Sequence, residues 1–351
     1  MTYVSNYCVD DVIENNQSED MMELEAPSYR YSFGYRLALS CPSMMHHTSD
    51  EGWQVFLALR SNSYLLVGSS DDCDISSINV LELLLKYDPA VIVMQDHREW
   101  ASSNPLHLPN EVYKNWECLK NYDSCFKVTI LKDAHQRPWY HRRCAEDMGC
   151  NAWIVYYHPK IVKHLAKYVR SQHLIRTYHS IDSLKVPEFT DRGRNGVILS
   201  GAISFHYPLR TKLFYHLPSD VFRLRHPGYV NNYCYTYDFM NMLSRFKVSI
   251  CTASKYGYAL RKIFESVACG CVVVTDLPSD DVLPEIDECL VRISPSTSVN
   301  EVYEICKELE DNYDADKCKY YADKCKRYYD YRHIGRLLAY DIDRLMRTYS
   351  S

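Results

Sequence analysis

Short runs of apolar residues alternate with stretches of helical periodicity along most of the chain. In the first half, this pattern predicts strands near residues 36–40, 64–68, 90–94, 127–131 and 153–156, and helices near 53–59 and 80–87. In the second half, it predicts strands at 196–201, 222–224, 248–251 and 271–275, and helices at 209–216, at 239–245, between the last two strands and from 302 onward. Such alternation implies βαβ units and mostly parallel sheets, because a parallel crossover needs a dozen or more residues.

The chain divides into two halves at a stretch of turn-forming residues. Positions 187–195 contain Pro187 and Gly193 but little apolar content, so we place a linker there. We expect one Rossmann-like domain over residues 29–186, a second over 196–330, and a terminal helix at 331–351 that packs back on the first. Residues 1–28 are acidic and lack apolar periodicity, which predicts a mobile leader. A chain of 351 residues is long enough for two such domains.

Composition excludes several classes of protein. Hydrophobic residues make up 46% and charged residues 24%, as in ordinary globular domains, and no run approaches the roughly 18 apolar residues of a membrane span. The first residues are acidic up to Arg30, unlike a secretory signal, and the 15 cysteines are irregularly spaced. We therefore expect reduced thiols and a cytoplasmic protein. Cys318 and Cys325 lie seven residues apart, which favours helix packing over metal ligation, so we predict no metal site.

The most informative segment runs from residue 252 to 278. A loop of small residues, 252–258, leads into a helix that carries Arg261, Lys262 and Glu265 and is followed by a buried strand. The backbone N–H groups of such a loop and the positive end of the helix can meet phosphate. Glu265 can accept two hydrogen bonds from ribose hydroxyls, and the planar fork of Arg261 can bind a diphosphate.

This segment resembles the donor-binding signature of glycosyltransferases of the GT-B type, particularly the spore-maturation-type branch. The resemblance extends upstream to the strand end at Gly201, the helix entry at Arg210 and the turn at 226–229. It implies an α/β fold of two Rossmann-like domains that face each other across a cleft, with the nucleotide sugar in the C-terminal half and the acceptor in the N-terminal half. The donor-binding residues that it implies are Gly201, Arg210, His226, Tyr229, Ser254, Tyr256, Gly257, Tyr258, Arg261, Lys262 and Glu265.

The chain departs from the family pattern at one position. Retaining enzymes of this type often carry a second glutamate eight positions before the ribose-binding one, where it contacts the donor sugar, and here that position is Gly257. We expect backbone amides near Tyr256 and Tyr258 to make the sugar contact instead. Retention of the anomeric configuration follows from the resemblance alone.

Polar residues that follow strands of the first half are the candidates for catalysis and acceptor binding. The segment at Asp133 and His135 resembles the strand-end histidine region that faces the transferred sugar in related retaining enzymes, and histidine titrates near neutrality. The remaining candidates are Asp96 and His97 for catalysis and His46, Arg137 and Trp139 for the acceptor side. The basic and aromatic residues at 137–143 also have the composition of a nucleic-acid contact, but the sequence pI of about 6.3 disfavours that interpretation.

Together these features predict a metal-independent glycosyltransferase that needs no cofactor. Its donor would be a UDP- or GDP-linked sugar, and its acceptor a hydroxyl of a glycan, lipid, protein or modified nucleic acid. In this scheme Arg261, Arg210 and nearby amides stabilise the leaving diphosphate. The alternatives are a sugar-nucleotide epimerase of the same fold, a DNA-modifying glycosyltransferase, and a non-catalytic module that binds sugar or nucleic acid.

Overall fold

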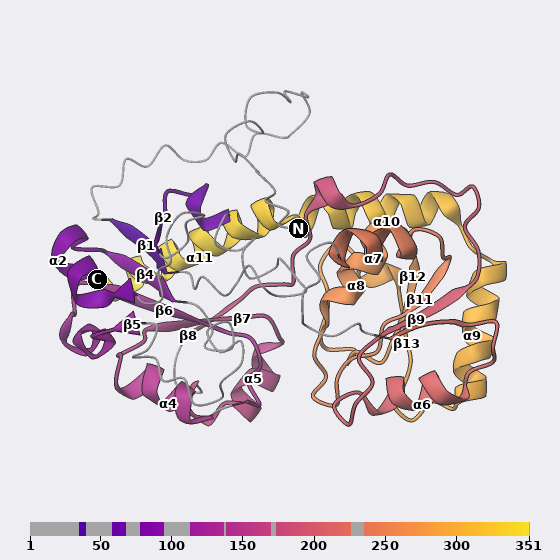
Figure 1. Cartoon of the computed structure of the whole chain (residues 1–351), viewed down its shortest axis with the longest axis horizontal. Helices are drawn as coiled ribbons and strands as arrows, with labels where there is room; N and C mark the ends of the chain where they lie inside the picture. Colours follow the sequence, from indigo (N-terminus) through magenta and orange to yellow (C-terminus); the bar gives the residue numbers. More distant parts are fainter. Residues whose placement is uncertain are drawn as a thin grey trace, which may run out of the picture. The chain divides into compact units, whose positions relative to one another are not determined.

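The computed structural model describes residues 35–39, 58–67, 78–94, 113–136, 138–169, 173–225 and 235–350. Residues 34–351 form one compact unit. The predicted leader at 1–28 lies outside the described residues. Within the described ranges the chain forms two large, wholly parallel sheets (Figure 1). None of the described helices combines the length and the apolar character needed to cross a membrane.

The first sheet has six strands in the order β2-β1-β4-β6-β7-β8. The strands are β1 (Arg36–Leu39), β2 (Leu65–Val67), β4 (Val91–Met94), β6 (Phe126–Leu131), β7 (Ala152–Val155) and β8 (His173–Arg176). Helices α2 (Val80–Tyr87), α4 (Pro138–Glu146) and α5 (Pro159–Leu165) belong to the same half, as does a small pair of strands, β3 (Ile78–Asn79) and β5 (Tyr113–Lys114).

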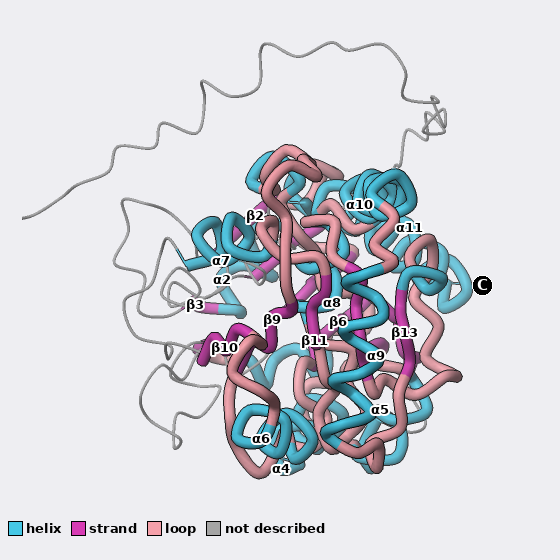
Figure 2. Tube along the Cα trace, turned by 90° about the vertical axis from the view of Figure 1, so that its right-hand side faces the viewer, coloured by secondary structure: helices cyan, strands magenta, loops and turns pink. Residues whose placement is uncertain are grey.

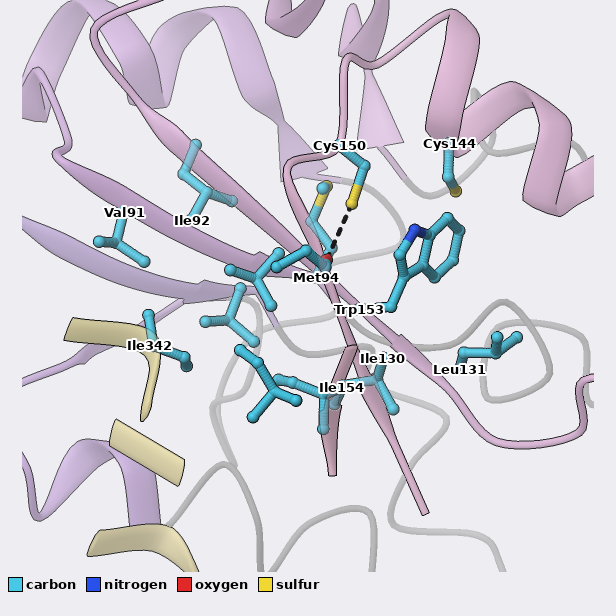
Figure 3. Packing of buried hydrophobic residues seen from close by; sticks show 14 of the residues in the cluster. Val91, Ile92, Met94, Ile130, Leu131, Cys144, Cys150, Trp153, Ile154 and Ile342 are labelled. Carbon is cyan, nitrogen blue, oxygen red and sulfur yellow. Dashed lines mark hydrogen bonds between the residues drawn. The ribbon is translucent and has the colours of Figure 1, made fainter. Parts of the chain in front are cut away.

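The central strands of this sheet read as unbroken apolar runs because both of their faces are covered. Every residue of β4, β6 and β7 is buried. Figure 3 shows Val91 and Ile92 of β4, Ile130 of β6 and Ile154 of β7 in one cluster of side chains. In sheets of this kind, the polar residues that follow the carboxyl ends of the strands line the ligand crevice.

The second sheet has five strands in the order β10-β9-β11-β12-β13. The strands are β9 (Val197–Gly201), β10 (Phe222–Arg225), β11 (Val248–Ile250), β12 (Val272–Thr275) and β13 (Leu290–Arg292). Helices α6 (Pro208–His216) and α9 (Val299–Asp311) pack on one face of it, and α7 (Tyr235–Leu243), α8 (Arg261–Ala268) and α10 (Ala315–Tyr328) lie on the other (Figure 1). Figure 2 shows α9 in front of β11, which it contacts.

The last helix, α11 (Tyr331–Ser350), packs on the first sheet, as the sequence predicts. Its apolar residues Leu338, Ile342 and Met346 belong to the core of that sheet, and Figure 3 shows Ile342 among the strand residues. Its Asp343 accepts a hydrogen bond of 3.1 Å from Arg36 of β1. The C-terminal segment therefore ties the two halves of the chain together.

Candidate functional site

Those predicted donor-binding residues that the structure describes lie at the carboxyl edge of the second sheet. Strand β9 ends at Gly201, and β11 leads through the loop 251–260 into α8. Because all five strands are parallel, the segments that follow β9, β11 and β12 meet at the same edge. In open α/β sheets this edge forms the ligand crevice.

Gly201 lies in a crowded position at this edge. Its φ is +125°, a region that favours glycine. A β-carbon on Gly201 would overlap Lys262 Nζ and would lie 2.7 Å from NH1 of Arg210. Two cations from different elements, α6 and α8, therefore converge on one strand end.

Arg210 is held in place by the backbone around it. Its Nε donates to Thr252 Oγ1 at 3.1 Å, and NH2 donates to the Thr252 carbonyl at 2.7 Å. Its guanidinium carbon lies 4.2 Å from the centre of the Tyr207 ring, and the residue is only 2% exposed. Arg210 is therefore not a solvent-exposed side chain, because it is buried and is fixed by oxygens of the loop between β11 and α8.

Lys262 is the unusual residue of the site. Its Nζ is buried, and no atom of the described residues accepts a hydrogen bond from it. Burial, with the Arg210 guanidinium as the second cause, lowers the pKa of Lys262 to about 7, and the Glu265 carboxylate opposes this shift. A buried ammonium beside a second cation is unfavourable unless an anion joins them. The pair therefore forms a ready site for a phosphate.

Arg261 and Glu265 contact each other within α8. Arg261 Nε lies 3.1 Å from Glu265 Oε1, and the two side chains are 9% and 8% exposed. This spacing of four residues brings the two side chains onto one face of the helix. The two residues that the sequence assigns to ribose and diphosphate thus lie together at the same edge of the sheet as Lys262.

The loop before α8 is compact and carries the predicted small residues. The Ser254 carbonyl accepts a hydrogen bond from Gly257 N at 2.8 Å, and Ser254 Oγ accepts one from Tyr256 N at 3.2 Å. Gly257 has a φ of +72°. A β-carbon on Gly257 would lie 3.1 Å from Pro278 Cγ and 3.4 Å from Ile161 Cδ1. The backbone conformation at Gly257 therefore disfavours any side chain, which agrees with the absence of a glutamate at this position.

His135, which follows β6 of the first sheet, contacts this loop. Its Nδ1 lies 3.1 Å from the Tyr258 hydroxyl, and its ring stacks on Tyr256 with centroids 3.9 Å apart. Tyr258 in turn stacks on Tyr157 at 3.7 Å, and the Tyr157 hydroxyl donates to Asp133 Oδ1 at 3.4 Å. The two catalytic candidates that the structure describes, Asp133 and His135, thus belong to one aromatic network with the loop 251–260, which we call the donor loop.

Sequence reasoning missed Tyr157 and assigned no individual role to Thr252 or Asp276, although both lie in the segment 252–278 that it singled out. Thr252 anchors Arg210, as described above, and Asp276 Oδ1 accepts a hydrogen bond from Ala253 N at 2.6 Å. Burial raises the pKa of Asp276. Asp276 directly follows a predicted strand, and that position could have indicated it. Thr252 and Tyr157 also directly follow predicted strands, at 248–251 and 153–156, so the same signal could have indicated them, although their contacts with distant segments depend on the fold.

The remaining predicted site residues lie outside the described residues. These are Asp96, His97, His46, Arg137, His226 and Tyr229, together with the side chain of Trp139.

A cavity of about 590 Å³ lies at the same edge of the sheet. Ser254, Tyr256 and Gly257 of the donor loop line it, as does Ile161 of α5. The volume lies within the range of about 300–1,000 Å³ that is typical of small-molecule sites.

Comparison with solved structures identifies the fold. Sucrose-phosphate synthase from Thermosynechococcus elongatus covers 90% of this chain over 100% of its own length, with a TM-score of 0.56 and 11% identity. HepE from Anabaena, solved with UDP-glucose, covers the same shares with a TM-score of 0.56 and 10% identity. AviGT4, a glycosyltransferase of avilamycin A biosynthesis, covers 90% of this chain over 98% of its own, with a TM-score of 0.51 and 10% identity.

These neighbours are GT-B glycosyltransferases, so the chain has the GT-B fold that the sequence predicts. At this level of identity, the likeness extends to the fold and not to the spore-maturation-type branch. No family model matches the sequence, and no curated protein is similar enough to match it.

Proposed function

We propose that the protein is a glycosyltransferase that uses a nucleoside-diphosphate sugar as its donor. The observation that carries this proposal is the buried ammonium of Lys262, which lies with Arg210 against Gly201 and has no acceptor among the described residues. A diphosphate supplies the anion that this pair lacks. Solved structures of the same fold support it, because HepE is seen with UDP-glucose and with UDP and glucose.

The donor is oriented by the residues around this pair. The diphosphate lies between Gly201, Arg210 and Lys262, and the ribose lies toward Glu265. As the bond to the sugar breaks, negative charge grows on the leaving diphosphate, and the two cations stabilise it without reorganisation. The reaction therefore runs without a metal ion, since Lys262 and Arg210 supply the positive charge.

The transferred sugar lies toward His135, and the acceptor hydroxyl approaches from the first half of the chain. His135 is oriented by Tyr258 and Tyr256, which hold both the edge and the face of its ring. Its position supports a contact with the sugar or with the acceptor proton. By resemblance to retaining enzymes, we propose that the anomeric configuration is retained.

Calorimetric titration with UDP-glucose and GDP-mannose tests the donor site. Lys262→Met is expected to weaken binding of the accepted donor about ten- to hundredfold, the effect of losing one charge-assisted hydrogen bond. Lys319→Met removes the same charge from an exposed pair on α10 and is the matched control. Equal affinities for the parent and Lys262→Met would place the diphosphate elsewhere.

Product analysis then separates the reactions. Incubation with a nucleotide sugar and a panel of hydroxyl acceptors should give a glycosylated product and free nucleoside diphosphate. Release of an altered sugar without any acceptor would identify an epimerase. Binding with neither transfer to any acceptor nor hydrolysis of the donor would identify a binding module.

A further inference from the structure

The cavity beside the donor loop has its own residues and its own charge. Gly201, Arg210 and Lys262 do not line it, whereas Pro208 and Lys212 of α6 and Asp276 and Pro278 after β12 do. The cavity therefore shares Ser254, Tyr256 and Gly257 with the donor loop but contains none of the three residues of the diphosphate position.

The lining of this cavity is positively charged. It includes Lys212 and Lys255, and neither lysine forms an ion pair with a carboxylate in the described ranges. Asp276 is the one acidic residue among the lining residues, and its Oδ1 is occupied by the amide of Ala253 at 2.6 Å. Two ammonium groups without a carboxylate partner among the described residues favour an anionic ligand.

The walls suit a compact ring. Pro208, Pro278 and Pro295 form rigid apolar surfaces that offer no backbone N–H, and Tyr256 adds an aromatic face. Phe205, 71% exposed, lies next to this group, because Lys255 Nζ lies 4.3 Å from the centre of the Phe205 ring. Apolar walls with a few polar groups are typical of small-molecule sites.

The cavity also lies close to the reacting groups. Tyr256 lines it, and the ring of Tyr256 stacks on His135 with centroids 3.9 Å apart. A ligand in the cavity is therefore separated from His135 by one aromatic ring. Ile161 of α5 also lines the cavity, so the first half of the chain, from which the acceptor approaches, forms one of its walls.

We propose that this cavity binds the acceptor, and that the acceptor is an acidic sugar: a monosaccharide ring that carries a phosphate or a carboxylate. Lys212 and Lys255 bind the acidic group, and the prolines and Tyr256 hold the ring. This inference rests on the proposed glycosyltransferase function.

Calorimetry on the full chain tests the proposal with glucose 6-phosphate, glucuronate, glucose and inorganic phosphate, each with and without saturating UDP. One of the two acidic sugars should bind at least tenfold more tightly than both glucose and phosphate, and UDP should not displace it. Comparison of glucose 6-phosphate with glucuronate identifies whether the site prefers a phosphate or a carboxylate. The double variant Lys212→Ala/Lys255→Ala should weaken this binding at least tenfold and leave UDP affinity unchanged, and Lys319→Ala should change neither.

Three results would overturn the proposal. These are equal affinities for glucose and both acidic sugars, unchanged binding in the double variant, and competition with UDP, which would make the cavity part of the donor site. Failure of the parent protein to bind either UDP-glucose or GDP-mannose would instead count against the proposed function, so the two ideas fail separately.

Discussion

The ammonium of Lys262 occupies the space that a β-carbon on Gly201 would fill. Strand β9 and helix α8 are therefore matched to each other at this point, since only a residue without a side chain leaves room for the cation. The glycine does more than give a ligand access to the backbone. It allows the cation pair of Lys262 and Arg210 to form.

Gly201→Ala should therefore remove nucleotide-sugar binding and lower stability. The added methyl displaces Lys262 and Arg210, and alanine is strained at a φ of +125°. We expect a loss of about 1–3 kcal/mol in the free energy of unfolding, measured by denaturant titration, and a loss of UDP-glucose binding by calorimetry. Gly193→Ala is the control, because Gly193 has a φ of +81° but no atom within 4 Å of its added β-carbon. The Gly193→Ala variant should lose stability but keep UDP-glucose binding. If both variants bound UDP-glucose equally well, the proposed displacement of Lys262 and Arg210 would be contradicted.

Donor binding should become weaker as the pH rises above about 7. The groups that act on Lys262 are Arg210, Glu265 and Cys251, and burial with Arg210 places its pKa at about 7 in the free protein. A bound diphosphate raises that pKa, so binding takes up a proton at pH 8. UDP-glucose suits this test because its diphosphate diester does not titrate in this range. We expect affinity to fall up to about tenfold per pH unit above 7.

Calorimetry in buffers of different ionisation enthalpy measures this proton uptake, which should approach about one proton at pH 8 and disappear in Lys262→Met. The stability of the free protein should change in the opposite sense. Between pH 7 and the usual lysine pKa, the unfolded chain binds a proton that the folded chain does not, so the free energy of unfolding rises with pH. Uptake that persists in Lys262→Met would assign the proton to another group.

Apolar patterning predicted most of the described strands because they are buried on both faces. Strand β4 reads Val-Ile-Val-Met and β12 reads Val-Val-Val-Thr, and such runs need no tertiary information. Strands β3, β5, β8 and β13 were not predicted, and β13 illustrates why. It has three residues, only Leu290 is buried, and Arg292 makes hydrogen bonds to the carbonyls of Leu277 and Pro278 instead of packing. A short edge strand has no alternation long enough to recognise.

The site residues, like the strands, show features that the sequence identifies and features that it does not. Arg261, Lys262 and Glu265 stand in one continuous segment, so the sequence alone identifies them as a group. The contact of Lys262 with Gly201 depends on how α8 lies across the strand ends, and the contact of His135 with Tyr258 joins elements from the two sheets. The spacing of these residues along the chain does not reveal either contact. The sequence therefore indicated which residues to consider, and the structure shows which of them meet.

Gly257 provides the test of how far the family pattern applies. If this position only lacked a carboxylate, Gly257→Glu would restore a contact to the donor sugar and raise turnover. The geometry predicts otherwise, because φ is +72° and a β-carbon would press against Pro278 Cγ at 3.1 Å. Gly257→Glu and Gly257→Ala should both lose about 1–3 kcal/mol of unfolding free energy, and the glutamate variant should turn over no faster than the alanine variant. Denaturant titration and initial rates with a saturating donor measure both effects. A glutamate variant faster than the alanine variant would show that the loop rearranges to present the carboxylate. If the two are equally slow, the sugar contact at this position comes from the backbone, and no side chain can replace it.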